Sequence, residues 1–263
     1  MKNPPRFFIS PESIDRANGT ITFNQRQLLA QIINVLRMRA GDPIDVLDGL
    51  GRIYHCRLGP IPNNKKQASF SLSALIEESA DAKGEPPLPI AIALPILRPN
   101  RYEWALEKLT ELGASSIVPI IVQHSVQREG KLERWQAIVR EAAEQCERAL
   151  IPQVLAPIRL KDYLKAVTTI GPLQVTFICV ERSFAQALPV VLCNQMVPAP
   201  HKISVIVGAE GGFTEEEIQL AENAGAKPVS LGNRILRSET AAIYALSLIV
   251  SQVDQNPLAA GTI

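Results

Sequence analysis

The sequence predicts an α/β protein in which a mostly parallel sheet follows a smaller, β-rich domain. From Ile90 onward, apolar strand candidates alternate with helical patterns, which is the signature of such a sheet. Residues 1–75 instead contain mainly short strand candidates. Between them lies the polar stretch EESADAKGEPPLP, whose prolines are typical of a linker. We therefore expect domains at residues 1–75 and 90–263, joined by a linker at 76–89.

The first domain is expected to hold five short strands and one helix. The strand candidates are residues 6–9, 20–23, 44–47, 52–58 and 68–75, with a turn at 48–51. The helix should begin near Asn24 as its cap. Helical spacing would place Leu28, Ile32, Val35 and Leu36 on one buried face.

The charge is distributed unevenly along the chain. The net charge is only +1, but residues 1–75 hold ten Lys or Arg against five Asp or Glu. A basic small domain suggests where a polyanion would dock. The alternative is a basic face that is simply solvated.

Composition excludes several classes of protein. With 46% hydrophobic and 20% charged residues, the chain is typical of a soluble globular protein. No apolar run is long enough to span a bilayer, and the opening MKNPPRFFIS lacks a signal-peptide core, so we expect a cytoplasmic protein. Cys56, Cys146, Cys179 and Cys193 are widely scattered, so we expect reduced, mostly buried thiols and no metal site.

The second domain is expected to contain strands at residues 90–94, 116–122, 175–180, 203–207 and 227–231. Apolar residues recur at helical spacing over 102–112 and again over 132–146. Trp104 and Trp135 lie within these helical stretches. We expect both to pack in the core rather than to stack on bases.

Two loops of the second domain are suited to grip one small molecule. The strand at 203–207 runs into Gly208, Gly211 and Gly212, where the backbone can approach a ligand closely. Thr214 and Glu217 fit a capping box, so a helix should follow and end at Gly225. The pattern repeats with a strand near 228–231, a loop at 232–237 and a helix at 239–253 capped by Ser238.

Both loops should lie beyond the carboxyl ends of parallel strands, where open sheets bind ligands. Neither the P-loop nor the dinucleotide spacing is present, and Glu210 in the first loop would repel a phosphate. A neutral ligand, or one with a positive centre such as S-adenosylmethionine, fits better.

The two motifs GAEGGFTEEEI and LGNRILRSETAAIYAL resemble the signature of the RsmE family. These are SPOUT-class methyltransferases that modify N3 of a uridine in 16S ribosomal RNA. Further segments resemble the same family, among them EKLTELG at residues 107–113 and KLERW at 131–135. The resemblance implies a PUA-like β-barrel at the N-terminus, a deep trefoil knot around the two loops, S-adenosylmethionine as cofactor, and a homodimer whose interface completes the site.

The resemblance also implies the cofactor contacts. They are Leu94, Gly208, Glu210, Gly211, Gly212, Leu231, Gly232, Ile235, Leu236, Thr240 and Ala241. Ile235 and Leu236 would sandwich the adenine, or alternatively would be core residues that anchor the loop.

Two side chains are candidates for catalysis, because uridine N3 carries a proton that must leave before or during its attack. The Arg237 guanidinium would stabilise charge on O2 or O4, or hold a phosphate, unless it is a salt-bridge partner of Glu239 or Glu210. Glu210 would act as the base, hydrogen-bond the cofactor, or merely tether its loop to backbone amides.

The expected partner is 16S ribosomal RNA or the small ribosomal subunit, with no membrane partner. The candidate RNA contacts are Arg6, Arg37, Arg39, Arg101, Arg148 and Arg234. Gln31 and Leu150 depart from residues common in the family, which bears on RNA docking but not on the cofactor motifs. The same chemistry on another RNA, or a non-catalytic RNA-binding protein, are the alternatives.

Overall fold

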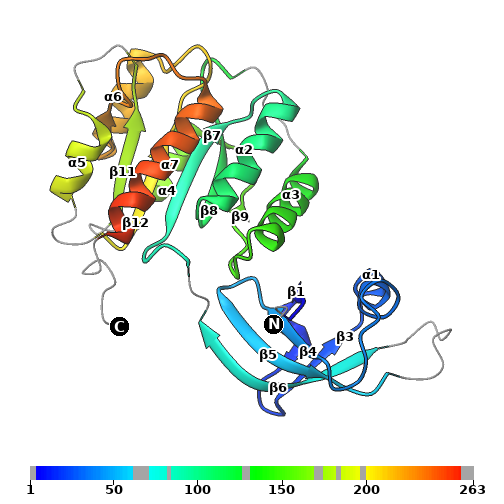
Figure 1. Cartoon of the computed structure of the whole chain (residues 1–263). Helices are drawn as coiled ribbons and strands as arrows, with labels where there is room; N and C mark the ends of the chain where they lie inside the picture. The colour runs from blue at the N-terminus through cyan, green and yellow to red at the C-terminus, as the bar shows by residue number, and fades with distance from the viewer. Residues whose placement is uncertain are drawn as a thin grey trace. The chain divides into compact units, whose positions relative to one another are not determined.

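The computed structural model describes residues 4–61, 71–81, 84–125, 131–168, 174–181, 185–195 and 200–255. The chain forms two compact units (Figure 1). The first comprises Met1–Glu85 together with Ala143–Ile151, and the second comprises Pro86–Ala142 and Pro152–Ile263.

The first unit contains one six-stranded sheet of order β1-β4-β5-β6-β3-β2. Its strands are β1 (Arg6–Phe8), β2 (Ile14–Asp15), β3 (Thr20–Phe23), β4 (Pro43–Leu47), β5 (Arg52–Leu58) and β6 (Leu72–Asp81). Only β1 and β4 pair in parallel; the other pairs are antiparallel. The sheet curls around a core that includes Phe23, Ile44 and Tyr54, with the shape of half a barrel (Figure 1).

The helix expected near Asn24 differs from the prediction. It is short, α1 (Arg26–Ala30), begins after Gln25 without a side-chain cap, and continues as a π-helical turn (Gln31–Val35). Leu28 and Ile32 are buried as expected, but Val35 and Leu36 are exposed. The wider turn rotates the last two side chains away from the core.

The linker and the domain boundaries also differ from the prediction. β6 extends to Asp81, so residues 76–81 belong to the sheet rather than to a linker. The segment Ala143–Ile151 joins the first unit, although it lies far along the chain. Its alanines Ala143 and Ala149 pack on Phe8 and Leu47.

The second unit is built on a parallel sheet of order β10-β8-β7-β12-β11-β13, with β9 beside β8, as the alternating pattern predicted. Its strands are β7 (Ile90–Pro95), β8 (Ser116–Ile121), β9 (Gln153–Val154), β10 (Ile158–Arg159), β11 (Gln174–Cys179), β12 (Lys202–Ile206) and β13 (Lys227–Val229). Every residue of β7 is buried, because helices cover both faces of the sheet.

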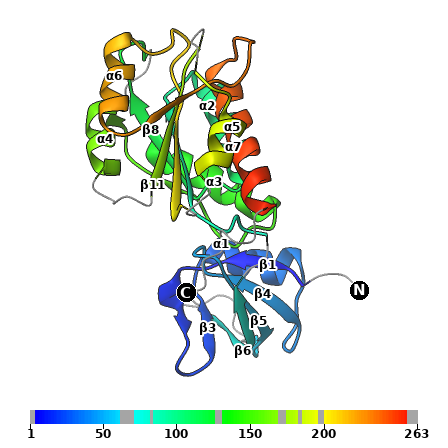
Figure 2. The same cartoon turned by 90° about the vertical axis from the view of Figure 1, so that its left-hand side faces the viewer.

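The helices form two layers. α2 (Pro99–Glu111), α5 (Leu188–Gln195) and α7 (Ser238–Asp254) pack together on one face, and α4 (Leu160–Thr168) and α6 (Glu215–Asn223) cover the other (Figure 2). The remaining helix is α3 (Leu132–Gln145). The trefoil knot implied by the resemblance stays a prediction.

Several local expectations can be compared with the helices. The capping box of Thr214 and Glu217 is confirmed at the start of α6. Ser238 does not cap α7; it is the first helical residue, and Arg237 occupies the cap position without a side-chain bond. Trp135 is buried against Tyr102, with ring centroids 4.7 Å apart, whereas Trp104 is 45% exposed and so is not a core residue.

Candidate active site

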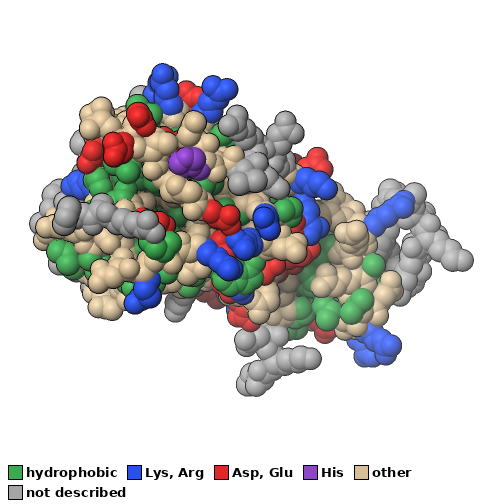
Figure 3. Space-filling model, turned by 90° about the horizontal axis from the view of Figure 1, so that it is seen from above, with side chains coloured by type: hydrophobic (Ala, Val, Ile, Leu, Met, Phe, Trp, Pro, Cys, Tyr) green, Lys and Arg blue, Asp and Glu red, His purple; other side chains and the backbone are tan. Residues whose placement is uncertain are grey.

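A cavity of about 610 Å³ opens at the carboxyl ends of β11, β12 and β13. Residues 179–181, 207–213 and 230–236 form most of its wall, completed by Ile218, Ser238 and Ala241. Figure 3 looks onto this end of the second unit, where acidic, hydrophobic and other side chains border a hollow. The two predicted loops therefore meet at one site.

The three glycines of the first loop are needed for different reasons. Gly212 has φ +71°, a conformation that other residues rarely adopt. A Cβ on Gly208 would lie 3.1 Å from the Phe213 ring, and one on Gly211 would lie 3.0 Å from His124 Cγ. Side chains at any of the three would deform the cavity wall.

The segment after β8 supports this loop. The Gln123 N–H donates to Glu217 Oε1 over 2.7 Å, while Glu217 Oε2 accepts from the Thr214 N–H. His124 Nδ1 lies 3.2 Å from the Gly212 carbonyl oxygen. The sequence does not predict a role for His124, because no local pattern links this residue to the distant glycines.

The second loop joins β13 to α7. Gly232 has φ +102°, which again favours glycine. Ile235 lines the cavity yet is 55% exposed, so it is not a core residue that anchors the loop. Leu236 lines the cavity beside it.

The expected cofactor contacts divide into two groups. Leu94 is fully buried in β7, and Thr240 is exposed on α7; neither lines the cavity. The lining does include Gly208, Glu210, Gly211, Gly212, Leu231, Gly232, Ile235, Leu236 and Ala241.

Residues 179–181 were missed, because β11 was predicted as a strand without a glycine motif after it. Burial raises the pKa of the Cys179 thiol to about 12, so this cavity residue stays protonated and is a poor nucleophile. Glu181 is a second acidic residue of the lining, in addition to Glu210.

Arg101, rather than Arg237, pairs with Glu210 of the first loop and approaches Glu239 at the start of α7. Its Nη1 forms an ion pair with Glu210 Oε1, and its Nε lies 3.8 Å from Glu239 Oε1. Arg237 is exposed, and no described residue forms an ion pair with it. The alternative in which Arg237 bridges to Glu210 or Glu239 is therefore wrong.

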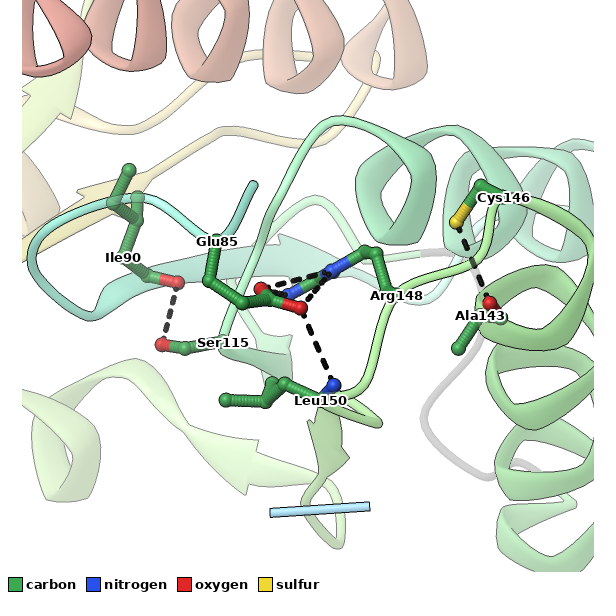
Figure 4. A network of polar contacts seen from close by, with 7 residues as sticks. All are labelled: Glu85, Ile90, Ser115, Ala143, Cys146, Arg148 and Leu150. Carbon is green, nitrogen blue, oxygen red and sulfur yellow. Dashed lines mark hydrogen bonds and ion pairs between the residues drawn. The ribbon is translucent and has the colours of Figure 1, made fainter. Parts of the chain in front are cut away.

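Two of the other predicted RNA contacts are engaged within the first unit. Arg148 is buried, and its guanidinium binds both oxygens of Glu85, which also accepts from the Leu150 N–H (Figure 4). This burial corrects its assignment as an RNA contact. Arg6 pairs with Glu147 at 2.9 Å and lies 3.5 Å from Asp45.

The remaining candidates, Arg37, Arg39 and Arg234, are exposed. Among the described residues, no cluster of His, Cys, Asp and Glu is arranged to hold a metal ion. Among the helices that the structure describes, none is both long enough and apolar enough to cross a membrane.

Comparison with known proteins agrees with this architecture. A family model described as an RNA methyltransferase domain matches residues 84–250, and one described as an RNA methyltransferase PUA domain matches residues 32–71. A ribosomal RNA small subunit methyltransferase E of Synechocystis is 36% identical over 93% of this chain and 76% of its own length. The chain belongs to the RsmE family.

Other members extend the comparison to structure. The Bacillus subtilis protein of the same name is 31% identical over 85% of this chain and 87% of its own. The crystal structure of the Neisseria gonorrhoeae enzyme bound to S-adenosyl methionine is 30% identical and has a TM-score of 0.76. It covers 95% of this chain and 98% of its own. The fold is therefore the SPOUT-type α/β fold of RsmE enzymes with an N-terminal PUA domain, and the protein is an RNA methyltransferase.

Proposed function

We propose that this protein transfers a methyl group from S-adenosylmethionine to N3 of a uridine in 16S ribosomal RNA of the small ribosomal subunit. The observation that carries the proposal is the cavity formed by both glycine loops at the carboxyl ends of β12 and β13. Family membership and the cofactor bound to the Neisseria gonorrhoeae enzyme support it. A substrate in the small ribosomal subunit implies that the protein acts in the cytoplasm.

The cavity residues fit this cofactor. A volume of about 610 Å³ is in the range of small-molecule sites. Glu181 and Glu210 both line the cavity, and their negative charge favours a ligand with a positive centre. Ile235 and Leu236 supply apolar surface for a purine ring.

When bound, the sulfonium supplies an activated methyl group with a neutral thioether as leaving group. The protein must therefore mainly orient the acceptor and assist loss of the N3 proton. Arg237 follows directly on the cavity residue Leu236, and its guanidinium has no ion-pair partner among the described residues. We assign it to the uracil oxygen on which charge develops.

Glu210 is the second catalytic candidate. Its Oε1 pairs with Arg101, whereas its side chain is 50% exposed and Oε2 has no hydrogen-bond partner among the described residues. That oxygen is available to accept a hydrogen bond from the cofactor or the N3 proton. Glu210→Gln distinguishes these roles: loss of a base lowers kcat at saturating cofactor, and loss of a cofactor contact raises KM.

RNA docking is proposed to use the exposed arginines Arg37, Arg39 and Arg234.

We further propose a homodimer. Trp104 on α2, Val190 on α5 and Tyr244 on α7 are 45%, 53% and 38% exposed on three helices that pack together. Such apolar surface is typical of an interface. Sedimentation at several protein concentrations would test the homodimer. If the Trp104→Glu variant is a monomer, the face that carries Trp104 is the interface.

The decisive experiment is methyl transfer from labelled S-adenosylmethionine to small ribosomal subunits that lack the modification, followed by nucleoside analysis. We expect 3-methyluridine at one site. Cofactor binding without any transfer would instead favour another RNA or a binding protein that lacks the activity.

A further inference from the structure

One arginine links the first cavity loop to the start of α7, which directly follows the second loop. Arg101 of α2 pairs with Glu210, which lies in the first loop, and approaches Glu239, which lies in the first turn of α7 after the second loop. The three residues come from three separate segments of the second unit. Arg101 itself does not line the cavity.

Glu239 requires this arginine. Its side chain is only 6% exposed, and its Oε2 is buried without a hydrogen-bond partner among the described residues. A buried carboxylate is costly unless a cation or hydrogen bonds compensate. The start of α7 provides part of that compensation through its free amides, and Arg101 provides the nearby positive charge.

Glu210 requires it for a different reason. It stands between Ala209 and two glycines, so its loop has little intrinsic rigidity. Among the described residues, the loop is also held by the Gly212 N–H to the Ala209 oxygen at 2.8 Å, by the contact from His124, and by the bond from Gln123 to Glu217 in the helix that follows. The ion pair to Arg101 is the loop's charged anchor.

We propose that Arg101 is a positioning residue that fixes the spacing of the two cavity loops and acts on the cofactor through Glu210 and Glu239. The inference rests on the proposed function, since it takes the cavity as the cofactor site. It also replaces the prediction that Arg101 contacts RNA, because a phosphate would have to displace two carboxylates from one guanidinium.

The test measures the Kd of S-adenosylmethionine by calorimetry for the full chain and its variants. Arg101→Ala is expected to raise this Kd at least about tenfold, since it leaves Glu239 buried without its nearby cation. The Kd of Arg101→Lys should lie between those of the unaltered protein and Arg101→Ala, because a lysine ammonium cannot reach both carboxylates as the planar guanidinium does. Arg98→Ala is the matched control: Arg98 is exposed, stands three residues before Arg101, and has no ion pair among the described residues. Its Kd should stay within about twofold.

Two further measurements separate positioning from general stability. At saturating cofactor, Arg101→Ala should keep kcat within about threefold while KM for the cofactor rises. Adding Glu210→Gln to Arg101→Ala should weaken binding by less than the two single changes together, because they break the same pair. If Arg101→Ala does not fold, Arg101→Lys and Glu210→Gln serve the same comparison.

The outcomes are distinct. Absence of S-adenosylmethionine binding by the unaltered protein would overturn the proposed function itself. Normal binding by the unaltered protein and by Arg101→Ala would overturn the positioning role alone. A variant with unchanged cofactor Kd but a raised KM for the ribosomal subunit would return Arg101 to the RNA contacts and likewise overturn it.

Discussion

The contact between Gly211 and His124 gives a quantitative test of the cavity. Substituting Gly211 by Ala would place a Cβ 3.0 Å from Cγ, 3.1 Å from Cβ and 3.2 Å from Nδ1 of His124. Carbon atoms prefer separations of about 3.5–4.0 Å, so the gap must widen by roughly 0.5 Å. Rotating the His124 side chain about its Cα–Cβ bond moves Cγ and Nδ1 away. It does not move Cβ, which is bonded to the backbone.

Overpacking of this kind costs about 1–3 kcal/mol. His124 is exposed, so we take the lower end of this range. The second unit should lose about 1–1.5 kcal/mol of stability when the loop keeps its native conformation. If the loop takes up this strain on binding, the Kd for S-adenosylmethionine should rise about five- to tenfold. Gly211→Val adds two methyl groups and should weaken binding further.

Calorimetric titration with S-adenosylmethionine measures the effect. The double variant Gly211→Ala/His124→Gly removes all three clashing atoms and should recover most of the affinity relative to His124→Gly alone. Gly225→Ala is the control: φ is +85° and no atom stands within 4 Å of its Cβ, so stability should fall by about 1 kcal/mol without a change in Kd. Unchanged binding by both Gly211 variants would refute the assignment of the cavity.

Three other predictions concern arginines. Arg237→Ala should lower turnover by about a hundredfold while the cofactor Kd stays within a few fold, and normal turnover would remove it from the mechanism. Arg37→Ala with Arg39→Ala should weaken RNA binding and lower its salt slope by about two, whereas an unaltered slope would argue against docking by the first unit. Arg148→Ala leaves the partly buried Glu85 without its cation, so urea unfolding should show a loss of about 3 kcal/mol with the salt slope unchanged. A reduced slope at normal stability would identify Arg148 as an RNA contact.

The sequence predicted those parts of the fold that depend on local patterns. Apolar runs gave the parallel strands, and Thr214 with Glu217 gave the start of α6. Helical periodicity failed at Val35 and Leu36, where the backbone forms a π-helical turn: the Leu36 N–H donates to the Gln31 oxygen, five residues earlier. A single wider turn changes which side chains face the core, and apolar spacing does not record it.

The cavity was predictable where a loop carries its own signal. Glycines after a strand identified both motif loops, and most of the residues named there line the cavity. The contributions of Glu181, His124 and Arg101 depend on which segments the sheet order brings together. For Arg148, just after α3, a basic side chain looks the same in sequence whether it faces solvent or is buried against Glu85.

The membership of Ala143–Ile151 in the first unit has a consequence for synthesis of the chain. Domains generally fold as units while the ribosome extends the chain from its N-terminus. Here the contacts of Phe8 and Leu47 with Ala149, and the partner of Glu85, do not exist until residue 151 has emerged. More than half of the polypeptide must therefore be made before the smaller unit is complete, and a fragment ending at Glu85 would lack part of its own core.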